Sequence, residues 1–327
     1  LRRFGLVAGR GDGRIEAVGR LTDPVTHRLA GRALLPGFVN AHSHAFQRGL
    51  RGLGETFPDD AGSFWTWREA MYELVAAATP ARVEALSRAA FEEMRDAGIT
   101  AVGVFHYLHH AADDARDWAL DDAVRRAAAA AGIRLVLIQT AYLHGGIDAP
   151  LAGGQRRFDG GSVEAFAARL EALAGRLDAA REHLAVAAHS IRAITPEELA
   201  ALHELAVRMD VPLHMHLEEQ PAELEACRAR YGAGPLAVVL GAIPVDRRFT
   251  AVHATHSVPA DLERLCGAGG GICLCPLTEA NLGDGLADVP AMAAANAVIS
   301  LGTDSNARIS MLEEMRWTEL GQRLRTG

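Results

Sequence analysis

Eight short apolar runs, each followed by a longer polar or amphipathic segment, restrict the possible folds of this chain more than any other feature. They cover residues 33–41, 100–107, 133–142, 184–190, 211–217, 249–255, 271–276 and 297–305. Nearly continuous apolar runs are typical of parallel strands that are buried on both faces. Eight alternations of strand and helix favour a closed (β/α)8 TIM barrel over an open sheet.

Two of the intervening segments carry clear signals of helix boundaries. Residues 79–98 contain Pro80, which suits a first helical turn, and end at Gly98, which suits the C-terminal cap. Residues 195–210 begin with Thr195 and Glu198 at the spacing of a capping box. Each segment also has one apolar stripe and therefore predicts a helix that packs on the sheet.

Residues 1–32 precede the barrel pattern and differ from it. They predict a strand, a turn and a second strand, which we assign to a small β domain, and residues 33–327 then form the barrel. The chain does not begin with Met, so we expect it to be a fragment with this small domain incomplete.

The composition argues against several classes of function. A net charge of −8 disfavours a nucleic-acid partner, no apolar run is long enough to cross a bilayer, and the N-terminus lacks the apolar part of a secretion signal. The four cysteines form no C-x-x-C pair, which favours free thiols in a reducing cytoplasm. The chain has no lysine, so a lysine Schiff base or a lysine that bridges two metals is excluded.

Polar residues fall repeatedly where the predicted strands end. An H-x-H motif is weak evidence alone, but the chain has two, and the carboxyl ends of barrel strands are where catalytic groups gather. Residues i and i+2 of a strand point the same way, so each motif could aim both imidazoles at one point. Three imidazoles and one carboxylate suit a zinc ion that keeps a position for water. The two motifs are His42 with His44 and His214 with His216. The residues at the strand ends are His42, His44, His189, His216, His253 and Asp304.

Simpler interpretations of single residues remain open. Asp304 could be a helix cap or turn residue, and a lone histidine at a strand end is more often structural. We expect the histidines of "FHYLHH", which are His106, His109 and His110, to be solvated or to support the site from outside. Cys273 and Cys275 are expected to pack inside the barrel. The coincidence of suitable residues at five strand ends nevertheless favours a metal site.

Glu219 follows His216 by three residues, where the chain should turn out of its strand. From there a carboxylate can reach metal-bound water without binding the metal, and can carry the proton of that water to a leaving nitrogen. His253 could polarise the water or stabilise a developing oxyanion. Residues 45–79 and 143–163 are long connections on the same side of the barrel, so we expect them to form walls of a substrate pocket.

These strings resemble a known family. "LPGFVNAHSH", "HMHLEE", "VHATH" and "LGTDS" are similar to the amidohydrolase superfamily, in its branch with one metal and no lysine ligand. The strings "HSHAFQRGLRGL", "FWTWREAMY", "FHYLHH", "AHSIRA" and "CPLTEANLGDG" resemble the formimidoylglutamate deiminases of histidine degradation over nearly the whole chain. That family continues past residue 327 with a segment that completes a small β-sandwich domain, so we expect this chain to be truncated at its C-terminus.

The resemblance implies a cytoplasmic homodimer that hydrolyses N-formimidoyl-L-glutamate to N-formyl-L-glutamate and ammonia. It implies one Zn²⁺ per chain, with Glu219 as proton shuttle, His253 as assistant to the water and Asp304 as both ligand and catalytic residue. The zinc ligands would be His42, His44, His216 and Asp304. The acidic amidine substrate would contact Gln47, Arg68, Tyr107, His189 and Arg192. Arg192, at the end of the fourth strand, could bind a substrate carboxylate in bidentate fashion.

Two other hypotheses compete with this one. A different amidohydrolase could deaminate a heterocycle, and its pocket would favour aromatic stacking over anion binding. A non-catalytic binding protein could retain a vestigial metal site. A panel of substrates assayed with the metal fully loaded separates all three.

Overall fold

The computed structural model describes residues 6–9, 15–19, 24–53 and 63–327. The chain divides into two compact units, Leu1–Pro36 and Gly37–Gly327. In the first unit, β1 (Leu6–Gly9) and β2 (Ile15–Gly19) pair in antiparallel fashion, with an irregularity in register between Ala8 and Gly9. The turn expected between these two strands lies outside the described residues.

The second unit is a parallel barrel, as the eight apolar runs predict. Its described strands follow one another in chain order around the sheet, and each pairs in parallel with the next. They are β3 (Phe38–Ser43), β4 (Ile99–His106), β5 (Arg134–Ala141), β6 (Glu182–Ala188), β7 (Leu213–Leu217), β8 (Phe249–His253), β9 (Gly271–Leu274) and β10 (Val298–Leu301). Residues 33–37 were expected to begin the first strand, but β3 begins only at Phe38.

The ring closes between its first and last strands. The N–H of His44 donates to the carbonyl of Asp304 at 2.8 Å, and the N–H of Asp304 donates to the carbonyl of His42 at 3.0 Å. Gly302 permits this approach, because a Cβ at that position would lie 2.5 Å from the His42 carbonyl oxygen. Closure therefore brings the two ends of the barrel sequence together at the residues expected to bind a metal.

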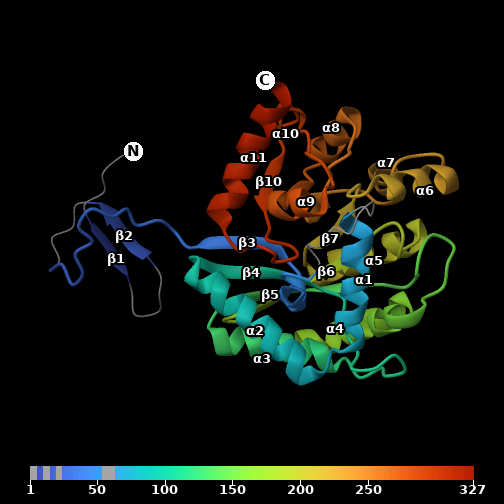
Figure 1. The fold of residues 1–327 in the computed structure, drawn as a ribbon, viewed down its shortest axis with the longest axis horizontal. Coiled ribbons are helices and arrows are strands. Elements are labelled where there is room, and N and C mark those ends of the chain that lie inside the picture. Colours follow the sequence, from blue (N-terminus) through green and yellow to red (C-terminus); the bar gives the residue numbers. More distant parts are fainter. Residues whose placement is uncertain (1–5, 10–14, 20–23, 54–62) are drawn as a thin grey trace. The chain divides into compact units, whose positions relative to one another are not determined.

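Helices cover the outside of the barrel, and Figure 1 shows α2 and α3 beside β4 and β5. The helix predicted after Thr79 is α2, in which the Thr79 side chain accepts from the Arg82 N–H. The helix predicted after Thr195 is α5, with both bonds of the Thr195–Glu198 capping box in place. The main helices that follow strands are α2 (Pro80–Asp96), α3 (Ala119–Ala131), α4 (Val163–Ala174), α5 (Pro196–Met209), α6 (Pro221–Tyr231), α7 (Pro235–Ala242), α8 (Pro259–Gly267), α9 (Pro276–Leu282), α10 (Val289–Ala294) and α11 (Met311–Thr326).

One large apolar core lies between the strands and these helices. Phe91 and Met94 of α2 and Phe166 of α4 are completely buried in it. Cys273 and Cys275 are also buried, in a small cluster with Val252. Of the helices described here, none is both long and apolar enough to span a bilayer.

The two long connections carry structure of their own. The connection between β3 and α2 contains the 3-10 helix η1 (Ala45–Leu50) and helix α1 (Ser63–Ala76). The connection between β5 and α4 contains a second 3-10 helix, η2 (Gly153–Phe158). Both connections leave carboxyl ends of strands, so they lie at the end of the barrel where the polar residues gather.

Candidate active site

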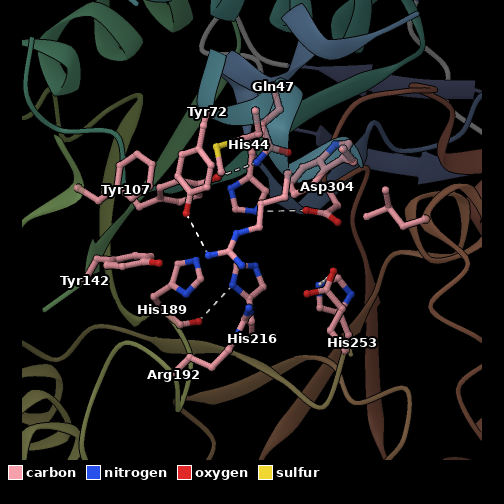
Figure 2. A pocket seen from close by; sticks show the side chains of 16 residues that line it. His44, Gln47, Tyr72, Tyr107, Tyr142, His189, Arg192, His216, His253 and Asp304 are labelled. Atoms are coloured by element: carbon pink, nitrogen blue, oxygen red, sulfur yellow. Dashed lines mark hydrogen bonds and ion pairs between the residues drawn. The ribbon is translucent and has the colours of Figure 1, made fainter. Parts of the chain in front are cut away.

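Four side chains converge at the carboxyl ends of the barrel strands. The Nε2 atom of His42 lies 3.2 Å from that of His216 and 3.3 Å from Oδ1 of Asp304. The Nε2 atom of His44 lies 3.2 Å from the same carboxylate oxygen. Each of the four residues offers one donor atom, and these atoms all lie within 4.8 Å of one another. Figure 2 shows His44, His216 and Asp304 facing one another.

These spacings suit a metal ion. Bonds of about 2.0–2.1 Å in a tetrahedral site place neighbouring donor atoms roughly 3.3 Å apart. The Nε2 atoms of His42 and His216 lie 3.2 Å apart, close to this spacing, so a cation between them would bind both lone pairs. The donor set of three imidazoles and one carboxylate therefore fits a divalent metal.

Hydrogen bonds orient two of the imidazoles. The Nδ1–H of His44 donates to the carbonyl of Phe105 at 2.8 Å, and that of His216 donates to the carbonyl of His189 at 3.1 Å. Each bond places the proton on Nδ1 and leaves the Nε2 lone pair directed at the metal position. The carbonyl groups of Phe105 and His189 thus fix the tautomers of His44 and His216.

The environment also sets the charge of these groups. Burial lowers the pKa of His42 to about 3 and holds that of His216 well below its usual value. Burial alone would raise the pKa of Asp304, but hydrogen bonds and charge from His42 and His44 hold it well below its ordinary range. Neutral imidazoles and an ionised carboxylate are the forms that bind metals.

The second H-x-H motif contributes only one of its two histidines to this group. His216 joins it, whereas His214, lower on β7, is not among the four converging residues. Burial lowers the pKa of His214 to about 4. The first motif contributes both histidines because His44 lies just beyond the end of β3, where the chain bends.

Glu219 lies in the pocket beside the metal position, and its Oε1 atom is 3.8 Å from Nε2 of His253. The preceding residue, Glu218, has a left-handed backbone with φ of +55° that turns the chain out of β7. The Glu218 carboxylate is buried and accepts from the Ser257 hydroxyl and the Leu236 N–H. Of the two consecutive glutamates, Glu219 is therefore the one that faces the pocket.

His253 is the last residue of β8, and its ring lies between the carboxylates of Glu219 and Glu279. Its Nδ1 atom lies 3.3 Å from Oε1 of Glu279, which also accepts from the Cys275 N–H at 2.9 Å. Burial disfavours the charged imidazole, but the charge of Glu219, the bond to Glu279 and the charge of Asp304 together raise the pKa of His253 well above its usual value. Its φ of +69° is a strained conformation of the kind that gathers at functional sites.

The predicted substrate contacts all line one cavity. Figure 2 shows Gln47, Tyr107, His189 and Arg192 around the same space as the metal group. The Gln47 amide donates to the Tyr107 hydroxyl at 2.7 Å. Arg192 lies with its Nε 3.4 Å from the buried Oε1 of Glu223, so part of its charge is already balanced within the protein.

Arg68 is the second cation of this cavity, and it comes from α1. Its Nη2 donates to the Tyr72 hydroxyl at 3.2 Å, one helical turn further along. Tyr72 and Tyr142 were not predicted to line the site. Tyr72 lies in the "FWTWREAMY" segment that was expected to form a wall, and Tyr142 ends the third apolar run, so both carried a usable signal. Glu279 belongs to the string "CPLTEANLGDG", whose resemblance to the deiminases gave this residue no role.

The three histidines of "FHYLHH" were expected to be solvated or to support the site from outside, and the first alternative is wrong. His106, His109 and His110 are all buried. Asp121 lies 3.1 Å from His106 Nε2 and 3.0 Å from His109 Nδ1. Arg169 also contacts this carboxylate at 3.3 Å and neutralises it, so the cluster is better suited to structural ion pairing than to a second metal.

A parallel barrel with imidazoles and a carboxylate converging at its strand ends, beside a pocket carboxylate, has the architecture of a metal-dependent hydrolase. The chain belongs to the amidohydrolase family, whose model matches residues 33–326. It is 43% identical over 303 residues to formimidoylglutamate deiminase of Pseudomonas aeruginosa, which covers 91% of this chain and 66% of that protein.

Two further similarities extend the comparison. The chain is 31% identical to 8-oxoguanine deaminase of Pseudomonas aeruginosa, over 90% of this chain and 65% of that protein. The crystal structure of an amidohydrolase from Brucella melitensis superposes with a TM-score of 0.87 at 37% identity, over 98% of this chain and 71% of that one. The chain spans about two thirds of the length of the two curated relatives.

Proposed function

We propose that this chain is the catalytic barrel of a zinc-dependent deiminase that hydrolyses N-formimidoyl-L-glutamate to N-formyl-L-glutamate and ammonia. The observation that carries the proposal is that one cavity is lined by two chemically distinct groups of residues. These are the metal group with Glu219 and His253, and the guanidinium groups of Arg68 and Arg192. The similarity to formimidoylglutamate deiminase supports the same assignment.

The guanidinium groups of Arg68 and Arg192 in the lining of the cavity suit an acidic substrate. Guanidinium groups bind carboxylates through parallel hydrogen bonds, and their positive charge offsets the loss of hydration. Gln47, Tyr107 and His189 add polar atoms from three different connections of the barrel. A substrate with two carboxylates and a formimidoyl group would place its amidine carbon toward the metal when its carboxylates meet the arginines.

The hydrolytic step requires proton movement that Glu219 can perform. Zinc bound here would supply a Lewis acid that makes water nucleophilic near neutral pH. Glu219 would accept a proton from the attacking water and deliver it to the departing nitrogen as the carbon–nitrogen bond breaks and ammonia leaves. His253, held by Glu279, would donate a hydrogen bond to the oxygen that adds to the amidine carbon.

We propose a single zinc ion bound by His42, His44, His216 and Asp304. The donor types favour zinc, and the absence of lysine removes the carbamate bridge on which one type of two-metal site depends. Asp304 would serve both as ligand and as a charge that stabilises His253.

A heterocycle deaminase is the second candidate, and one observation favours it. The cavity is lined by the aromatic rings of Trp67, Tyr72, Tyr107, Tyr142 and Phe158, on which a planar base could stack. The similarity to 8-oxoguanine deaminase also favours this second candidate. Two arginines in the cavity favour the acidic substrate, because a neutral base would leave their charge without a partner in the ligand.

Release of ammonia from N-formimidoyl-L-glutamate, measured together with metal content, tests the proposal. We expect turnover that scales with zinc occupancy, and little or no release of ammonia from 8-oxoguanine or adenosine. Faster deamination of a heterocycle would favour the second candidate. No hydrolysis of any substrate by fully zinc-loaded protein would indicate a binding protein with a vestigial metal site.

The remaining features of the proposal concern organisation. We propose that residues 1–32 belong to a small β-sandwich domain and residues 33–327 to the barrel, in keeping with the antiparallel pair β1–β2. By family resemblance we also propose a cytoplasmic homodimer that acts in histidine degradation.

A further inference from the structure

Arg157 is a buried cation in η2, outside the group of residues that line the cavity. Arg157 is only 2% exposed, and its guanidinium donates to main-chain carbonyl oxygens of two other connections. Nε donates to His110 at 2.9 Å, and Nη2 donates to Ala78 at 2.7 Å and to Ala111 at 2.9 Å. Nη1 donates to the carbonyl of Val75.

Of the two acceptors in the connection that carries α1, Val75 lies in the last turn of the helix and Ala78 lies two residues beyond it. The carbonyl groups of a last helical turn form the negative end of the helix dipole, so a cation that donates there is favourable. Burial itself disfavours the charge and lowers the pKa of Arg157. Main-chain carbonyl groups accept from the guanidinium, and the charges of Asp113 and Asp117 also favour its protonated form.

The other two acceptors belong to the connection that follows β4. That connection also donates back, since the N–H groups of His109 and His110 both bond to the carbonyl of Arg157 at 3.0 and 3.1 Å. Arg157 therefore joins three connections at the mouth of the barrel: the one that carries α1, the one after β4, and its own after β5.

The helix held in this way forms one wall of the cavity. Trp67, Arg68, Met71 and Tyr72 of α1 all line it. The residue next to Arg157, Phe158, also lines the cavity, and its ring packs 4.9 Å from that of Tyr107, centroid to centroid. Displacement of η2 or α1 would thus move the wall that carries one of the two cavity cations.

We propose that Arg157 is a positioning residue for substrate binding, which acts by fixing α1 so that Arg68 faces the cavity. The inference rests on the proposed function in naming the acidic substrate, but the fixation of α1 does not depend on it. The metal group is held by β3, β7 and β10, so Arg157 should influence substrate affinity more than the chemical step.

Kinetics of Arg157→Met, with Arg156→Met as matched control, test the role in binding. Arg156 is the preceding residue and is exposed. For Arg157→Met we expect KM for N-formimidoyl-L-glutamate to rise roughly 10-fold or more, with kcat changed less than about 3-fold, the pattern of lost uniform binding. Zinc content should equal that of the wild type. Arg156→Met should leave both constants unchanged.

The coupling to Arg68 provides a second kinetic test. If Arg157 acts through Arg68, the double variant Arg68→Met/Arg157→Met should raise KM little more than Arg68→Met alone. Fully multiplicative effects on KM would overturn the proposed route. Arg157→Lys keeps the charge but loses the planar array of donors, so it should fold and give an intermediate KM. If Arg157→Met does not fold, the KM of Arg157→Lys provides the test instead.

Hydrogen exchange tests the fixation of α1 without any assay of activity. In Arg157→Met, amides of residues 67–78 should exchange about 10-fold faster or more, while those of α2 and α5 remain as protected as in the wild type. Arg156→Met should show no change. Equal loosening of all helices would reveal a general stabilising role and refute the positioning role, and unchanged exchange in α1 would refute it as well. If the expected exchange pattern is observed but the wild-type protein does not hydrolyse N-formimidoyl-L-glutamate, the proposed function alone would fail.

Discussion

The Nε2 atoms of His42 and His216 lie 3.2 Å apart although 174 positions separate the two residues in the chain. His42 is on β3 and His216 on β7, so neither local sequence nor strand pairing brings them together. Closure of the barrel does so. With both Nε2 lone pairs directed inward, two neutral imidazoles at this distance would bind one cation between them.

This relationship predicts that His216→Ala loses bound metal and activity together. We expect about one zinc per chain in the wild type by elemental analysis, and less than about a tenth of that in the variant, because a ligand is lost from a four-residue site. His183→Ala is a suitable control, since His183 is exposed near the opposite end of its strand. Two metals per chain, or full occupancy in His216→Ala, would contradict the proposed site.

Glu219→Gln should separate proton transfer from metal binding. Because Glu219 lies in the cavity but is not one of the four converging residues, the amide should keep the metal and the substrate affinity. Loss of a general acid–base group typically lowers kcat by about 10²–10⁴-fold. Steady-state kinetics with parallel zinc analysis measures this.

Glu225→Gln is the matched control for that change, because Glu225 is an exposed residue of α6. It should behave as the wild type. A kcat for Glu219→Gln within a few-fold of normal would rule out the shuttle role, and loss of zinc from that variant would show that Glu219 contributes to metal binding instead.

Much of this site could be predicted because parallel strands in a barrel end at one face. A histidine at the end of an apolar run therefore carries three-dimensional information, as His42, His216 and His253 illustrate. Glu219 was chosen because it follows His216 by three residues, and the family resemblance implied the same residue. In the structure the difference between Glu219 and its neighbour Glu218 arises from the left-handed backbone of Glu218, which strand periodicity does not predict.

Other relationships depend on packing between elements, which the sequence pattern does not encode. His109 was expected to be solvated or to support the site from outside, but it is buried and its Nδ1 pairs with Asp121 of α3. Arg157 and Arg156 are adjacent and identical in type, yet only Arg157 is buried, because the tertiary position of α1 offers carbonyl acceptors to one of them. No periodicity separates these two arginines.

Glu314 predicts a dependence of stability on pH. This carboxyl group is fully buried in α11, and burial raises its pKa to about 9, although the Leu277 N–H donates to it. In the unfolded chain its pKa is near 4.5. The folded state thus retains a proton that the unfolded state has lost, so this group's favourable contribution is complete below pH 4.5 and declines as pH rises toward 9.

Glu314→Gln should therefore become more stable relative to the wild type as pH increases. We expect little difference in the free energy of unfolding near pH 5 and a gain of roughly 1–3 kcal/mol near pH 8, since each unit of pH in this window costs about 1.4 kcal/mol at most. Urea unfolding at the two pH values measures it. Glu319→Gln, at an exposed position of the same helix, should show no such trend. A gain independent of pH would contradict the assignment of a buried, protonated carboxyl group.

The pairing of Arg192 with Glu223 permits a test that separates substrate binding from folding. Arg192→Met should lower kcat/KM for N-formimidoyl-L-glutamate by the equivalent of roughly 2–5 kcal/mol, because a substrate carboxylate would lose its cation in a desolvated cavity. The same change leaves the buried carboxylate of Glu223 without its partner, 3.4 Å away in the wild type, and should also reduce stability. The double variant Arg192→Met/Glu223→Gln removes that unpaired charge.

We therefore expect the double variant to recover thermal stability but not activity. Zinc content should remain at the wild-type level in both variants, since neither residue is among the four that converge on the metal position. Arg228→Met, at an exposed position of α6, is the control for loss of a positive charge near this wall. If the double variant regained full kcat/KM, the effect of Arg192 would be structural, and the proposal that it binds the acidic end of the substrate would fail.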